Sequence, residues 1–121
     1  MYGYKYSKTS RAKTPRSYLS QLRSYYDRRD HLSLDFLEEL FYKQNGRCAI
    51  THVEMTHTQD GGKNPFNISI DRKDSSIGYV PDNVWLVCYK VNLMKHEGTL
   101  EELYFWSKKI IDAQEIDNGR Q

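Results

Sequence analysis

Four polar residues in the second half of the chain have types and an order that suit the cleavage of a phosphodiester bond. Asp71 ends a short alternating apolar run and Arg72 follows it, while Asn83 and Asn92 come later in the chain. The oxygens of Asp71 and Asn92 suit a hard divalent cation such as Mg²⁺ or Mn²⁺, which stabilises negative charge on a phosphate. The alternative is structural, with Asp71 capping a turn and Asn92 capping a helix.

The segments around these residues predict two strands and a helix. Residues 66–71 alternate at period two, which predicts a strand. A polar loop follows over 72–82, then a second strand over 83–87 and a helix over roughly 89–94. Such a unit brings the carboxylate and the last amide together although they are far apart in the chain.

Residues 46–96 resemble the core of the HNH endonucleases, whose fold is the ββα-metal motif. The resemblance rests on Gly46, Arg47, Cys48, Asp71, Arg72, Gly78, Tyr79, Asn83, Cys88, Asn92 and Lys95. The pattern is most similar to that of small HNH-type proteins of bacteriophages. The fold class that it implies is α+β, with a ββα-metal core, two N-terminal helices and a C-terminal helix.

The resemblance implies a metal-dependent endonuclease that nicks or cuts duplex DNA, of phage or mobile-element origin. Its catalytic residues are then Asp71, Arg72, Asn83 and Asn92, and its metal ligands for Mg²⁺ or Mn²⁺ are Asp71 and Asn92. Asp71→Ala is expected to abolish cleavage and to leave the thermal midpoint nearly unchanged. Lys95 is expected to contact phosphate, with a merely solvated lysine as the alternative.

Arg72 stands where the family usually has its catalytic histidine. A guanidinium is a poor base near neutral pH, but it binds phosphate oxygens well. Arg72 is therefore expected to orient the scissile phosphate, while the metal or a histidine, His57 or His52, activates water. Both histidines are equally compatible with a surface or packing role. By resemblance, the amide of Asn83 clamps the loop before it, although simple turn chemistry also accounts for that residue.

Two cysteines resemble remnants of a zinc site. Many HNH domains hold a structural zinc with two Cys-x-x-Cys segments, and here the corresponding segments begin at Cys48 and Cys88 but end in Thr51 and Val91. Two thiolates do not complete a four-ligand site, so structural zinc is not expected. The two cysteines are expected to stay reduced and to pack together as small apolar side chains. The alternative is that His52 and His57 complete the zinc site.

The N-terminal segment is basic. Residues 1–30 carry eight Lys or Arg against two Asp, within a chain of net charge +2, and hold six of its ten tyrosines. This asymmetry is typical of a segment that contacts phosphates. The residues expected to bind DNA there are Lys5, Lys8, Arg11, Lys13, Arg16 and Arg23. A solvated tail and helix face would carry the same charges.

The remaining segments complete a four-part layout. We expect a flexible basic arm over 1–14, a helical extension over 15–45, the HNH-like core over 46–96, and a C-terminal helix and tail over 97–121. Thr14 and Ser33 are candidate helix N-caps. The last helix opens with the capping box Thr99–Glu102 and presents an apolar side of Leu100, Leu103, Tyr104, Trp106, Ile110 and Ile111.

Whole-chain composition argues against a membrane-spanning protein and leaves three hypotheses about function. With 38% hydrophobic and 28% charged residues and no long apolar run, the 121-residue chain is expected to be one soluble domain without a membrane span. The start of the chain lacks a secretory h-region, which favours the cytoplasm, of the host if the protein is phage-encoded. The hypotheses are a metal-dependent DNA endonuclease, a DNA-binding module that lost catalysis, and an interaction protein of a phage assembly or counter-defence system.

Overall fold

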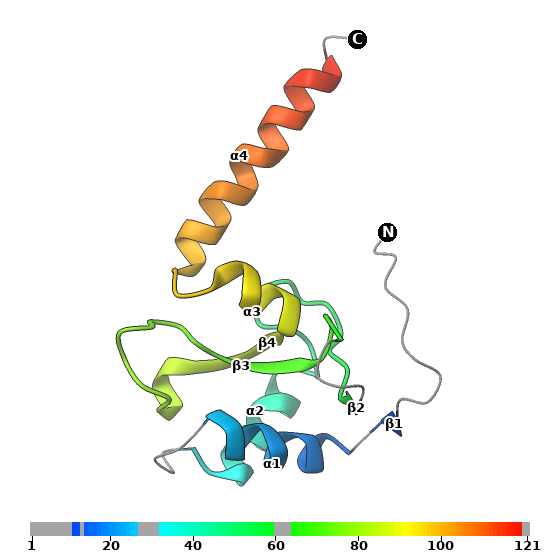
Figure 1. The fold of residues 1–121 in the computed structure, drawn as a ribbon, viewed down its shortest axis with the longest axis vertical. Helices are drawn as coiled ribbons and strands as arrows, with labels where there is room; N and C mark the ends of the chain where they lie inside the picture. The colour runs from blue at the N-terminus through cyan, green and yellow to red at the C-terminus, as the bar shows by residue number, and fades with distance from the viewer. Residues whose placement is uncertain (1–10, 13, 27–31, 60–63, 120–121) are drawn as a thin grey trace.

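The structure is a computed structural model that describes residues 11–12, 14–26, 32–59 and 64–119, with backbone alone at 11, 12, 26 and 118 (Figure 1). The described chain is mixed α+β, with four α-helices, a central two-stranded antiparallel sheet and a second, very short strand pair. The elements are β1 (Arg11–Ala12), α1 (Pro15–Tyr26), α2 (Leu34–Lys43), β2 (Thr58–Gln59), β3 (Ile68–Arg72), the 3₁₀ turn η1 (Pro81–Asn83), β4 (Val84–Cys88), α3 (Tyr89–Lys95) and α4 (Leu100–Gly119).

The central sheet lies between two helical layers. Helices α1 and α2 pack on one face of the β3–β4 hairpin and α3 packs on the other, as Figure 1 shows. The first two helices begin where the sequence predicts, because the Thr14 hydroxyl accepts a hydrogen bond from the amide of Ser17 at 3.1 Å and the Ser33 hydroxyl accepts one from the amide of Phe36 at 3.0 Å. The core is apolar and lies mainly between α1, α2 and the sheet.

Strand pairing decides which side chains face α3. In the antiparallel register, Ile68 is opposite Cys88 and Asp71 is opposite Trp85. Side chains alternate along a strand, so Ile68 and Ile70 enter the apolar core while Ser69 and Asp71 face the layer of α3. Ser69 and Asp71 are thus buried beneath α3, which confines them to one orientation.

The outer edge of β4 is covered by chain that follows α2. The side-chain amide of Gln44 donates to the carbonyl of Leu86 at 2.9 Å and accepts from its amide at 3.1 Å, which imitates a neighbouring strand. The amide of Ala49 donates to the same Leu86 carbonyl at 3.0 Å. These contacts satisfy backbone groups that an open sheet edge leaves unpaired.

Two expectations about the periphery need correction. Residues 11–12 do not belong to a free arm, because they pair with Thr58–Gln59 as β1 and β2; residues 1–10 and 13 lie outside the described chain. The sequence also predicts that the apolar residues of the irregular segment after α2 point inward, but one of them, Val53, is 41% exposed. No helix in the described part of the chain has the length and apolar character needed to cross a membrane.

Candidate functional site

The carboxylate of Asp71 is buried and already paired. Its side chain is 5% exposed, and the side chain of Lys95, which is fully buried, places its ammonium 3.1 Å from Oδ2 and 3.3 Å from Oδ1. The indole Nε1 of Trp85, the cross-strand neighbour, donates to Oδ2 at 2.7 Å. The same ammonium donates to the carbonyl of Arg72 at 2.9 Å. Lys95 therefore ties α3 to the end of β3.

The prediction that Lys95 contacts phosphate is corrected by this geometry. A lysine near the end of a short helix usually keeps its charged end in water. Here the side chain folds under the helix because a carboxylate and a carbonyl lie within its reach. The ammonium donates its hydrogen bonds to Asp71 and to the carbonyl of Arg72, both inside the protein. Lys95 is therefore a positioning residue of the hairpin.

Asn92 lies on the same side of the sheet as Asp71 but bonds to a different residue. Its amide nitrogen donates to the hydroxyl of Ser69 at 2.6 Å. Since Ser69 and Asp71 are two residues apart on one strand face, the structure brings Asp71 and Asn92 to the same layer, as the sequence predicts. Both sit between β3 and α3, where a helix and a strand position them.

A divalent metal does not fit these two residues as they stand. An ammonium occupies the space next to both oxygens of Asp71, and a second cation there would be repelled at short range. The described residues hold no cluster of three or more His, Cys, Asp or Glu side chains placed to bind a metal ion. Asp71 and Asn92 are thus part of a hydrogen-bonded core rather than an open pair of ligands.

Asn83 holds the loop between the strands, as the resemblance predicts. Its side-chain oxygen accepts from the amide of Asp74 at 3.0 Å. Its nitrogen donates to the carbonyls of Asp74, Ile77 and Gly78 at 2.9, 3.2 and 3.1 Å. One buried amide therefore satisfies four backbone groups of the loop and fixes how the chain leaves β3.

Replacing Asn83 by alanine should loosen this loop more than the rest of the fold. Four backbone partners lose a buried amide, which is expected to destabilise the protein by about 1–3 kcal/mol. Limited proteolysis should then cut the loop between β3 and η1 before other sites. Asp82→Ala, at the exposed neighbour, is the control and should match the parent. Parental protease resistance of the loop in Asn83→Ala would show that the clamp is dispensable.

Two cations at the end of the hairpin rest on aromatic rings. The guanidinium carbon of Arg72 lies 5.1 Å from the centre of the Tyr79 ring, and the Lys73 ammonium lies 5.5 Å from the Trp85 ring. Arg72 is half-buried and Lys73 is exposed. Because Arg72 follows Asp71 on the strand, its side chain leaves the opposite face of the sheet. Asp71 is therefore bonded to Lys95 beneath α3, whereas Arg72 packs on Tyr79 on the other side of the sheet.

The histidines proposed as bases lie elsewhere. His57 packs its ring against Phe41 at 6.2 Å between centres, and its Nδ1 is buried without a hydrogen-bond partner in the described chain. It precedes β2 and lies near Asn67, just before β3, whereas Asp71 is three residues beyond the start of that strand, about 10 Å along it. His52 is exposed on the turn after Cys48. Neither histidine contacts Asp71 or Arg72 among the described residues.

The two cysteines meet in the core, as the sequence predicts. Cys48 and Cys88 are both free and buried. A hydrogen bond between the two thiols lowers the pKa of Cys48 and, together with burial, raises the pKa of Cys88. The amide of Thr51 also points at the Cys48 sulfur at 3.5 Å. The chain after Cys48 therefore turns back onto its sulfur.

The arginines of α1 bind within the protein. Arg16 forms ion pairs with Asp35 at 3.0 Å and with Glu38 at 2.6 Å, joining α1 to α2. The Nε of Arg23 donates to the carbonyl of Leu32. The prediction that both contact DNA is therefore not supported by their geometry. Of the other predicted contacts, Lys5, Lys8 and Lys13 lie outside the described residues, and Arg11 is described by its backbone alone.

Sequence reasoning missed Ser69, Lys73 and Trp85. Ser69 had a usable signal, since it shares the strand face of Asp71 at period two. Trp85 could have been suspected because a buried indole N–H needs an acceptor. No protein-family model matches the chain, and no curated protein or solved structure matches it either. Any functional proposal for this chain therefore rests on its own residues and geometry.

Proposed function

We propose that this protein is a DNA endonuclease of the HNH type, with β3, β4 and α3 as its ββα unit. The strongest support is the set of four hydrogen bonds between the side chain of Asn83 and the loop before it. Their geometry is specific, and Asn83 stands at the position in the sequence where the HNH resemblance expects such an asparagine. The strand–loop–strand–helix order, with α3 laid across the face that carries Ser69 and Asp71, adds to it.

Duplex DNA would meet the end of the hairpin. Arg72 and Lys73 are cations held against aromatic rings, an arrangement that restricts their side chains and leaves charge available to a phosphate. A guanidinium can donate two parallel hydrogen bonds to phosphate oxygens and stabilise charge that develops on them. Mg²⁺ or Mn²⁺ would supply further charge stabilisation, and it could use Asp71 only if Lys95 withdrew from that carboxylate.

A second function is favoured by the Asp71–Lys95 pair. If the ammonium stays on the carboxylate, the ββα unit keeps its shape without a metal, and the protein would bind DNA without cutting it. In that case the buried ion pair replaces the metal as the link between strand and helix.

A plasmid assay separates the two functions. Supercoiled plasmid is incubated with the full chain in Mg²⁺, in Mn²⁺ and in EDTA, and relaxed and linear products are measured. Cleavage that requires the metal and is lost in Arg72→Ala supports the endonuclease. No cleavage together with a gel shift in EDTA supports the binding module. Neither cleavage nor binding would reject both and favour an interaction protein.

Arg72 should be needed for charge rather than for proton transfer. We expect Arg72→Ala to lower the cleavage rate by two orders of magnitude or so, as loss of an electrostatic stabiliser does. Arg72→His should keep or raise activity, with a rate that increases with pH through the ordinary imidazole range. Rates measured across pH for both variants and the parent test this. Parental rates in Arg72→Ala would show that Arg72 takes no part in catalysis.

A further inference from the structure

Helix α4 carries six of the twelve exposed large apolar residues in the described part of the chain. It has 20 residues, so it is about 30 Å long, and in Figure 1 it projects from the body, which it meets at α3. Its exposed large apolar residues are Tyr104, Phe105, Trp106, Ile110, Ile111 and Ile116, each at least 49% exposed. A helix gains most of its stability from packing an apolar face, so such a helix is expected to be covered in solution.

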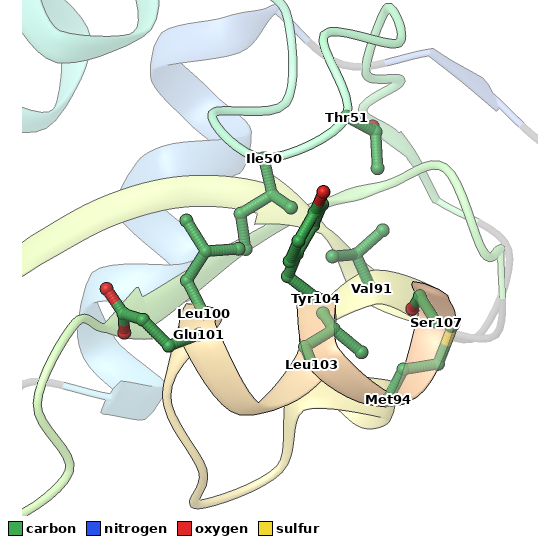
Figure 2. Close-up of a pocket in the computed structure, with 9 residues that line it drawn as sticks. All are labelled: Ile50, Thr51, Val91, Met94, Leu100, Glu101, Leu103, Tyr104 and Ser107. Atoms are coloured by element: carbon green, nitrogen blue, oxygen red, sulfur yellow. The ribbon is translucent and has the colours of Figure 1, made fainter. Parts of the chain in front are cut away.

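One face of α4 is continuous with a groove on the body. The groove has a volume of about 580 Å³, and Figure 2 shows the side chains that line it. Helix α4 contributes Leu100, Leu103, Tyr104 and Ser107, spaced as one helical stripe. Ile110 and Ile111 continue that stripe beyond the body. Helix α4 thus forms one wall of the groove, and Ile110 and Ile111 form an apolar ridge with a shape suited to a groove of this kind.

We propose that the occupant is a second copy of this chain, with the two α4 helices antiparallel across a two-fold axis near Tyr104. A two-fold pair uses one patch twice, so it needs a surface that is complementary to itself. In this arrangement the ridge of Ile110 and Ile111 from each copy lies over the corner of α3 and α4 of the other. That corner carries Met94, which lines the groove and is 57% exposed.

The charges on α4 favour the antiparallel pair. Glu101 and Lys108 are seven residues apart and so lie on one flank of the helix. When the two-fold axis passes between Tyr104 and Phe105, Glu101 of one copy lies opposite Lys108 of the other, and the pair occurs twice. Lys108 already bonds to Asp112 in its own helix at 2.8 Å, so its side chain is held along that flank.

The size of the surface requires that a stable dimer include the groove. With this axis the two α4 helices face each other over residues 100–109, and half of the outer surface of ten helical residues is on the order of 250 Å². A stable interface needs about 800 Å² from each partner. Contact between the two helices alone falls short of this, so the proposed dimer must also bury the groove beside α3.

The first test is the mass of the full chain in solution. Analytical ultracentrifugation over a wide concentration range should give twice the 14.4 kDa of one chain. Ile111→Asp should be a monomer, whereas Ile116→Asp, equally exposed but about 140° away around the helix, should remain a dimer. A parent that is monomeric throughout would overturn the proposal. So would an Ile111→Asp variant that still dimerises as the parent does.

A second variant keeps the test decisive if Ile111→Asp does not fold. Ser107→Cys places a thiol on the groove face, and Ile116→Cys places one on the other side of α4, while both native cysteines are buried. A short bismaleimide should link Ser107→Cys chains into dimers and leave Ile116→Cys largely unlinked. Equal linking of both would overturn the interface. Neither outcome depends on DNA cleavage, so this proposal and the proposed function fail separately.

Discussion

Replacing Lys95 by methionine is expected to lower the free energy of unfolding by about 3–5 kcal/mol. Methionine keeps much of the side-chain volume but removes the ammonium that neutralises Asp71, whose side chain is 5% exposed. The carboxylate would keep only the indole of Trp85, and the Arg72 carbonyl would lose its donor. For a chain of this length, the thermal midpoint should fall by roughly 10–20 °C.

Lys90→Met is the matched control, because Lys90 is an exposed lysine on the same helix. Its midpoint should stay within a few degrees of the parent. By the same reasoning, Asp71→Ala should also be strongly destabilised, since it strands a buried ammonium. This corrects the expectation, drawn from sequence, that Asp71→Ala leaves the midpoint nearly unchanged. A small effect in both Lys95→Met and Asp71→Ala would mean that the pair is open to water.

Lys95→Met also tests whether Asp71 can hold a metal. With the ammonium removed, a divalent cation can approach the carboxylate without repulsion. If the endonuclease proposal holds, Mg²⁺ or Mn²⁺ should raise the midpoint of Lys95→Met well above its value in EDTA, because a ligand that binds only the native state stabilises it. An identical midpoint with and without metal would favour the DNA-binding module.

The double variant Thr51→Cys with Val91→Cys is expected to acquire a zinc ion. The two residues take the place of the second cysteine in each Cys-x-x-Cys segment that the resemblance implies. Cys48 and Cys88 already touch, and the Thr51 amide donates to the Cys48 sulfur at 3.5 Å. Four thiolates complete a tetrahedral site, and structural zinc sites bind with about 10–16 kcal/mol.

The measurements are metal content after dialysis and the visible absorption of the cobalt-substituted protein. One zinc per chain is expected, with a midpoint that rises in zinc and falls in EDTA. The single variants, with three thiolates each, are the controls and should retain metal less tightly. If the double variant takes up no metal while remaining folded, the two segments are not arranged as zinc knuckles. The resemblance would then lose much of its support.

The sequence by itself determined the features that depend on neighbouring residues. Ser33 caps α2 and Thr99 pairs with Glu102 at the start of α4, as the pattern predicts, because each contact spans three residues. The same holds for the hairpin, where period-two alternation and a polar loop identify two strands. The bonds of Asn83 also stay within nine residues of it.

Only the tertiary structure decided how the charges are used. From the sequence, Lys95 reads as an exposed phosphate contact; in the fold it is buried against Asp71, 24 residues away. Likewise Arg16 is neutralised by Asp35 and Glu38 once α1 and α2 pack together. A long basic side chain can reach many partners, and which one it reaches depends on how a helix is placed over a strand.

The exposure of α4 could not be predicted from the sequence either. Its apolar residues predicted a buried side, yet Tyr104 and Trp106 are each 64% exposed. Helical periodicity reports which residues share a face, but it does not report what covers that face. The short turn after α3 directs α4 away from the core, so its apolar residues stay exposed in the described part of the chain.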